Sequence, residues 1–338
     1  AMGYQAGRLC EGSDAVAKGV YARDSTQGLE GVAIGYFAGY SNQGLYSTAV
    51  GVASGRYNQG NNATAVGSAA GETGQSQGAV AVGNASGYIN QQNYAIAIGN
   101  TAGRNDQKGF AVAVGTDSGY SNQASFSVAV GYQAGYSNQG YNSVTVGYNS
   151  GKYNQGTSSV ALGVGAGETT QGVNSVSVGY VSAYSNQGAG GVAVGHSSGH
   201  WNQGCNSVAV GYLSGFSNQR PFSSGVGFIA AQYNQGSYAQ AIGAFCGENN
   251  QGHFGTAVGH ASGRYNQGEN AVALGRYAGQ NSQAANSIAI DCTGGTLNPP
   301  RHGLWIDGIV NDAYSYAVGW KSNGEISYYT SDDRTKLQ

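Results

Sequence analysis

Hydrophobic and polar positions alternate in one short pattern along almost the whole chain. Residues 127–131 read Ser-Val-Ala-Val-Gly, and variants of this segment return every sixteen residues from Gly3 to Gly275 without insertion or deletion. If the glycine is position 0, branched aliphatic residues usually occupy −3 and −1, and alanine occupies −2. Alternation of period two with β-branched residues predicts a short strand. A repeat far shorter than a domain predicts a solenoid of stacked turns. We therefore expect an all-β, parallel β-solenoid.

The two faces of each strand carry different side chains. Successive residues of a strand point to opposite sides, so the branched pair shares one side and the alanine takes the other. We expect the branched pair to fill the coil of its own chain. The alanines, such as Ala129 and Ala209, would then form a smooth outer face that suits close approach by another copy of the chain.

A second repeated segment predicts a corner with an inward-pointing amide. Position +8 is glutamine in seventeen successive turns, between a frequent Asn at +7 and a frequent Gly at +9. Asn and Gly tolerate turn conformations, and the common Gly at +4 favours a positive φ. A ligand site would not be copied so often. We therefore expect glutamines such as Gln43, Gln139 and Gln203 to stack inside the coil as an amide ladder.

Aromatic residues recur at two positions that vary between turns and are therefore expected to be exposed, +5 and +6. Tyrosine and tryptophan next to asparagine can stack on sugar faces and hydrogen-bond to hydroxyls. An alternative interpretation is that the rings only stack on one another and shield the coil. The candidate binding residues are Tyr40, Tyr57, Tyr120, Tyr136, Tyr153, Tyr184, Trp201, Tyr233 and Tyr265.

Composition excludes several classes of function. A net charge of −2 with 9% charged residues argues against a nucleic-acid binder. No apolar run approaches the ~20 residues of a membrane span, so we expect no membrane insertion. The cysteines at 10, 205, 246 and 292 are far apart, and the three in the repeats occupy different positions of the repeat, which predicts isolated thiols. We predict neither a metal site nor a cofactor.

The repeat pattern ends before the chain does. Asp291 stands where the next glycine should be, so we expect the solenoid shaft to cover residues 1–290 and a Gly- and Pro-containing linker to cover 291–302. Three short strand candidates follow, at 303–308, 315–320 and 325–329. Residues 303–330 contain too little apolar surface for a core of their own, so this β-rich stem must pair with other chains or with the end of the rod.

The phrase Asn-Ser-Val-Ala-Val-Gly at residues 206–211 resembles the head repeats of trimeric autotransporter adhesins of the YadA type. The resemblance covers roughly residues 3–290. It implies a left-handed parallel β-roll and a homotrimer in which three rolls pack around a threefold axis. The sixteen-residue turn and the Asn-Gln-Gly corner depart from the usual bacterial pattern.

Residues 326–336 resemble the junction that precedes the endosialidase-type intramolecular chaperone, which ends phage tail fibres and some fibres of large eukaryotic viruses. In that family, a Ser-Asp-x-Arg-x-Lys segment marks self-cleavage. By this resemblance residues 331–338 begin a chaperone segment, and in a longer precursor Lys336 would accept the proton of Ser331, whose oxygen attacks the Thr330 carbonyl.

Together these features predict a structural fibre or receptor-binding protein of a virus or phage. It would lie on the virion surface and attach to a host-cell glycan or receptor. The alternative is the head of a bacterial trimeric adhesin. A glycan hydrolase needs paired carboxylates, and the coil offers only scattered acids, so we expect no enzyme apart from the self-cleavage. An ice-binding solenoid needs a threonine-rich position, which is absent. The scattered acids are Glu72, Asp106, Asp117, Glu168 and Glu248.

Overall fold

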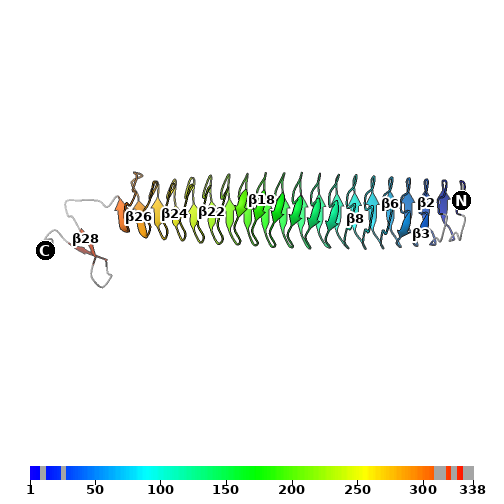
Figure 1. Ribbon diagram of the computed structural model, residues 1–338, viewed down its shortest axis with the longest axis horizontal. Helices are drawn as coiled ribbons and strands as arrows, with labels where there is room; N and C mark the ends of the chain where they lie inside the picture. The colour runs from blue at the N-terminus through cyan, green and yellow to red at the C-terminus, as the bar shows by residue number, and fades with distance from the viewer. Residues whose placement is uncertain (8–12, 24–27, 308–316, 321–325, 330–338) are drawn as a thin grey trace.

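The computed structural model describes residues 1–7, 13–23, 28–307, 317–320 and 326–329. Up to residue 307 they form a parallel β-solenoid of about eighteen turns with a sixteen-residue repeat, and the described residues contain no helix. Figure 1 shows the turns following one another in chain order along a straight rod. Eighteen turns at the usual strand spacing of about 4.8 Å give a rod about 85 Å long. The predicted fold class is confirmed.

One long sheet runs along the rod and contains the strands that end at the repeated glycine. Nineteen strands take part in it. They are β1 (Val16–Lys18), β2 (Val32–Ile34), β4 (Thr48–Val50), β6 (Thr64–Val66), β7 (Val80–Val82), β8 (Ile96–Ile98), β9 (Val112–Val114), β11 (Val128–Val130), β13 (Val144–Val146), β15 (Val160–Leu162), β17 (Val176–Val178), β19 (Val192–Val194), β21 (Val208–Val210), β22 (Ser224–Val226), β23 (Gln240–Ile242), β24 (Thr256–Val258), β25 (Val272–Gly275), β26 (Ser287–Asp291) and β27 (Gly303–Asp307).

A second side of the coil carries shorter sheets built from positions +6 to +8. Two turns pair through β3 (Ser41–Gln43) and β5 (Tyr57–Gln59). Six more pair in order through β10 (Ser121–Gln123), β12 (Ser137–Gln139), β14 (Tyr153–Gln155), β16 (Thr169–Gln171), β18 (Ser185–Gln187) and β20 (Trp201–Gln203). In the neighbouring turns the same side continues as isolated parallel bridges, for example Trp201 with Ser217. Each coil is therefore flat, with a strand on either side and a corner at either end.

The interior of the coil is lined by alanine, which contradicts the expected orientation of the strands. Ala129 and Ala209 are fully buried, whereas Val128 and Val130 are only partly covered. The alanines of −2 pack against small residues at +3, as in the cluster of Ala97, Ala102 and Ala113. The physical reason is the narrow coil. Once the glutamine of +8 points inward, little room remains opposite it, so the small side chain faces in and the branched pair faces out.

The glutamine ladder inside the coil is confirmed, and Gln43, Gln139 and Gln203 are all buried. Ten amide-to-amide bonds of 3.0–3.3 Å join glutamines one turn apart, as from Gln235 to Gln251. Each described glutamine of the ladder also donates to the carbonyl eleven residues earlier, as Gln235 Nε2 does to Ser224 at 2.8 Å. The ladder is not continuous, because the Oε1 atoms of five buried glutamines receive no bond from the preceding turn; these are Gln59, Gln139, Gln155, Gln187 and Gln219. At one of these breaks Thr145 replaces alanine, and Gln139 Nε2 lies 3.4 Å from the Thr145 hydroxyl. A row of buried glutamine amides therefore runs through the interior of the coil.

The repeated glycine marks the point where consecutive turns approach most closely. Gly131 has φ +128°, and a Cβ built on it would lie 2.4 Å from the carbonyl oxygen of Gly147 in the next turn. An L side chain rarely adopts this φ, and the neighbouring atom is backbone that cannot swing aside. The glycine therefore permits both the bend after the strand and the contact between turns.

Residues 291–302, expected to be a linker, instead form another turn of the coil. β27 pairs with β26 in parallel at the same sixteen-residue offset, so Asp307 lies beside Asp291. Leu297 packs against Ala273, Ala278 and Ala289. Pro299 takes the buried +8 place of glutamine. Asp291 replaces the glycine, and its Oδ1 accepts hydrogen bonds from the amides of residues 293 and 294 and from the hydroxyl of residue 293.

The strand candidates beyond residue 302 are confirmed. The first is β27, and the other two are β28 (Ala317–Trp320) and β29 (Ile326–Tyr329), which pair as an antiparallel hairpin. The predicted cleavage pair Ser331 and Lys336 lies outside the described residues.

Candidate functional site

The rings at position +5 stack on one another along the rod. Tyr120 and Tyr136 lie 4.8 Å apart with their planes 10° from parallel, and Tyr184 stacks on His200, which stacks on Phe216. Stacked in this way, the rings present mainly their edges outward, because their faces are covered by their neighbours. The interpretation of these rings as a shielding ladder therefore describes Tyr120, Tyr136 and Tyr184.

The rings at position +6 stand at a steep angle to the +5 rings. Tyr57, Tyr153, Trp201 and Tyr233 make edge contacts of 78–90° with Tyr40, Tyr136, Tyr184 and Phe216 respectively. Three of the +6 rings have a cation over the ring, namely Tyr57 with Arg56, Tyr153 with Lys152 and Tyr265 with Arg264. Among the described residues, no such cation lies over Trp201 or Tyr233. These two rings are 39% and 38% exposed, and Tyr153 is 38% exposed as well, so the absence of a cation over the ring is what makes Trp201 and Tyr233 the better candidates for stacking on a ligand.

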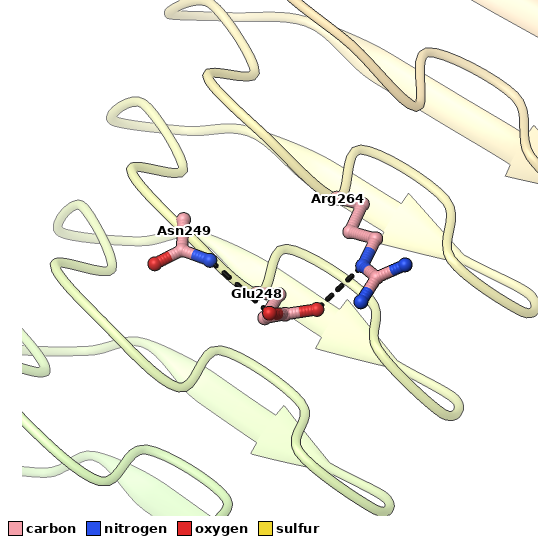
Figure 2. Close-up of polar contacts among 3 residues, drawn as sticks. All are labelled: Glu248, Asn249 and Arg264. Carbon is pink, nitrogen blue, oxygen red and sulfur yellow. Dashed lines mark hydrogen bonds and ion pairs between the residues drawn. The ribbon is translucent and has the colours of Figure 1, made fainter.

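Acidic side chains on this side of the coil have partners in adjacent turns. Figure 2 shows Glu248 between Asn249 and Arg264: its Oε2 accepts from Arg264 Nε at 2.5 Å, and its Oε1 accepts from Asn249 Nδ2 at 3.2 Å. Glu72 pairs with Arg56 at 3.4 Å, and Asp117 accepts from the Thr101 hydroxyl. Asp106 accepts from Asn90. Burial raises the pKa of Glu168, although Lys152 opposes this. The acids link turns rather than gather at one place.

A shallow groove of about 580 Å³ lies beside this side of the coil, over four consecutive turns near the middle of its C-terminal half. It is formed by positions +7 to +10. The residues that supply polar groups to it are Asn202, Asn218, Asn234, Asn250, Arg220 and His253. Since positions −3 and −1 contribute nothing to it, the groove stays separate from the branched apolar face.

Stacked asparagines form one wall of the groove. Each donates through Nδ2 to the Oδ1 of the asparagine one turn on, at 3.1 Å from Asn202, 3.2 Å from Asn218 and 3.0 Å from Asn234. Their φ values of 54–57° hold the amides outward, which confirms the expected turn conformation at +7. An asparagine amide carries two N–H donors, so one N–H of each remains for a ligand.

Arg220 adds a cation to the groove, and His253 adds a hydrogen-bond donor. Arg220 occupies position +9, which is glycine in eleven of the seventeen turns that carry the +8 glutamine, and its side chain is exposed. Neither an ion pair nor a hydrogen bond of its guanidinium is found among the described residues. His253 Nδ1 accepts from the Ser237 amide at 3.2 Å, so in the neutral ring Nε2 carries the proton. Sequence reasoning missed both residues, although Arg220 breaks the +9 glycine pattern.

The thiols are separate, as predicted for the three cysteines that the structure describes. Cys205 and Cys292 are exposed and free. Cys246 is buried, and burial raises its pKa to about 11. Within the described ranges no group of three His, Cys, Asp or Glu side chains could hold a metal ion, and no helix is long and apolar enough to cross a membrane.

A comparison of the chain with protein-family models, curated proteins and solved structures found no match.

Proposed function

We propose that this chain is the shaft of a homotrimeric attachment fibre on a virion surface, which holds host-cell glycans or a glycan-bearing receptor. The observation that carries the proposal is the apolar outer face of the long sheet. Ile98, Val146 and Ile242 are 40%, 39% and 45% exposed, and equivalent side chains flank them turn after turn. A contiguous apolar face of this extent marks an interface in a soluble protein.

Other copies of the same chain suit this face best. Its period is identical along the rod, so a second rod with the same sixteen-residue repeat matches it over its full length. Three copies around a threefold axis, as the YadA-type resemblance implies, would enclose the branched side chains of all three chains. The sides that carry the +5 to +10 positions would stay outside and free for ligands.

The alternative is the head of a bacterial adhesin, which would use the same trimer. The Ser-Asp-x-Arg-x-Lys segment at residues 331–336 favours the viral fibre, because it resembles a fibre junction rather than a coiled-coil stalk. Sequencing the gene on both sides of this segment separates the two, since a fibre requires a virion-anchoring domain and an adhesin requires a signal peptide.

The assembly is tested by light scattering on the purified chain and two variants. The unmodified 34.3 kDa chain should show three times its own mass. Ile242→Arg places a charge on the outer face and should yield folded monomers, because burying an unpaired charge between chains is costly. Ala241→Arg, one residue away but inside the coil, should disrupt the fold itself, as circular dichroism will show. A monomeric parent chain would overturn the proposed assembly.

A further inference from the structure

We propose that the groove lined by Asn202, Asn218, Asn234, Asn250, Arg220 and His253 binds an acidic saccharide, a sugar that carries a carboxylate or a sulfate. This inference rests on the proposed function, which assigns glycans to the fibre, and adds where they bind and which charge they carry.

Polar groups in the groove offer hydrogen bonds at the spacing of the turns. Beyond its ladder bonds each asparagine of the wall keeps one N–H and one Oδ1 lone pair, and the His253 ring offers Nε2–H. Donors in a row suit a ligand rich in hydroxyl and acidic oxygens. Because the wall repeats at the spacing of the turns, a chain of sugars running along the rod meets the same donor again and again.

Arg220 decides the charge of the ligand. Among the described residues that line the groove, Arg220 is the one arginine or lysine, and none is acidic. A guanidinium presents a planar fork that matches a carboxylate or a sulfate with two parallel hydrogen bonds. A neutral sugar would leave this fork without an ionic partner.

Aromatic rings adjoin the asparagine wall of the groove. Trp201 and Tyr233 immediately precede Asn202 and Asn234, and the small Ser217 separates them by one turn. Three residues separate position +6 from +9, which is at most roughly 10 Å even for an extended chain. A sugar ring can therefore stack on Trp201 while its acidic group reaches toward Arg220 in the next turn.

The chain contains a matched place that lacks this chemistry. Lys108 also occupies +9, but the preceding asparagine is replaced by Asp106, which stands in the ladder beside Asn90. A carboxylate two residues away compensates the lysine and repels an anionic sugar. Lys108→Ala is therefore the control for Arg220→Ala, because both remove a cation from the same position of the repeat, although Lys108 is half-buried and Arg220 is exposed.

The test begins with an array on which neutral glycans are paired with their carboxylated and sulfated forms, probed with the full chain and with Arg220→Ala, Lys108→Ala and Trp201→Ala. The parent chain should bind the acidic glycans and not their neutral partners, and comparison of the carboxylated with the sulfated glycans shows which acidic group is preferred.

Titration with the acidic oligosaccharide retained most strongly should give about tenfold weaker binding for Arg220→Ala, the order expected for a lost charged pair. Lys108→Ala should bind like the parent chain, and 1 M NaCl, added as about ten times physiological ionic strength, should weaken binding.

The outcomes separate the inference from the proposed function. Equal retention of neutral and acidic partners, or an Arg220→Ala variant that binds as the parent does, overturns the acidic-saccharide site and leaves glycan attachment standing. If the chain retains no glycan on the array and still attaches to cells treated with glycosidase, the glycan part of the proposed function is overturned as well. Equal losses in Arg220→Ala and Lys108→Ala would mean unspecific charge attraction and also overturn the site. Circular dichroism and light scattering on each variant confirm that fold and assembly are intact.

Discussion

At the scale of single residues, the unusual feature is a coil whose centre is held by amides. Buried polar groups are costly unless they find partners. Ten of the described +8 glutamines donate both to a backbone carbonyl and to the next glutamine, as Gln235 does to Ser224 and Gln251, and the others donate to the carbonyl without the bond to the next glutamine. The alanine beside each glutamine supplies no polar group and little volume. The glutamine at +8 and the alanine at −2 depend on each other, because a larger residue at −2 would displace the glutamine amide.

Replacing one ladder glutamine should therefore destabilise the coil. In Gln235→Leu, the Ser224 carbonyl, the Gln251 Oε1 and the Gln219 amide lose a buried partner. We expect a loss of about 2–4 kcal/mol in the free energy of unfolding, since each unsatisfied buried group costs about 1–3 kcal/mol. Chemical denaturation measures it. The same substitution at exposed Gln77 is the control and should change stability by less than about 0.5 kcal/mol.

His200 should make stability depend on pH. Burial between Tyr184 and Phe216 lowers its pKa from the usual value near 6.5, with a smaller contribution from His196, while the hydrogen bond from Nδ1 to the Val181 carbonyl opposes the shift. The unfolded chain therefore takes up the proton first. The contribution of His200 to stability is present above about pH 6.5 and decreases as the pH falls below it.

His200→Phe keeps a ring in the stack and removes the titrating group. Melting temperatures of the parent chain and this variant, measured from pH 8 to pH 5, should diverge below about pH 6.5, with the parent chain falling more steeply. Parallel curves over the whole range would show that His200 does not carry this dependence.

At the scale of the strand and its turn, the sequence specified the architecture but not the inside of the coil. The sixteen-residue step, the strand ending at the glycine and the inward glutamine were all predictable, because each has its own periodic signal. Alternation alone cannot tell whether −2 or the pair at −3 and −1 faces the inside of the coil. The exceptions to the pattern do indicate it. Position −3 tolerates Gln240 and Ser224, which suits a solvent-facing position, whereas −2 tolerates only small residues such as Ser177 and Gly225. The last turn was missed because Asp291 and Pro299 break the pattern that defines it.

The repeated glycine is the position of the turn that tolerates substitution least. Gly131→Ala combines a φ of +128° with a Cβ 2.4 Å from the next turn's carbonyl oxygen. Strained backbone of this kind costs about 1–3 kcal/mol even before the turns separate. Hydrogen exchange should show faster opening of the turns on either side, because each turn of a solenoid contacts only its neighbours.

The control for this substitution is Gly109→Ala. Gly109 lies at a half-buried corner, and the nearest atom to its built Cβ is the Asn93 carbonyl oxygen at 3.4 Å. Unchanged exchange rates in this variant, together with faster opening in Gly131→Ala, assign the effect to the contact between turns. Equal rates in the two variants would contradict it.

At the scale of the molecule, the rod carries two different surfaces. The branched residues form one apolar side, which we propose serves assembly, and positions +5 to +10 form another that displays rings, amides and the groove around Arg220. From the sequence, the aromatic positions could be identified but not ranked, because whether a ring face is covered depends on the neighbouring turn. Only the structure distinguishes Trp201, which has no cation over it, from Tyr153, which lies beneath Lys152.

The junction after the shaft is tested on a longer precursor. By the resemblance to the chaperone family, a precursor that continues through residues 331–338 into a chaperone should be cut before Ser331, which leaves a fibre that ends at Thr330. Mass spectrometry should find this product for the parent precursor and only the intact chain for Ser331→Ala. An intact parent precursor, or a Ser331→Ala precursor still cut at that bond, would show that the junction does not work in this way.

The direction of the backbone hydrogen bonds sets how the rod bears load. Bonds between turns, such as that from the Val128 amide to the Ser143 carbonyl at 2.9 Å, connect one turn to the next along the long axis. Tension applied to the two ends therefore loads the turns in series, and the weakest turn opens first while the others hold. Each opened turn releases sixteen residues, about 50 Å of extended chain. The attachment fibre proposed above would therefore lengthen under shear in equal steps, one turn at a time, before it detaches from the host cell.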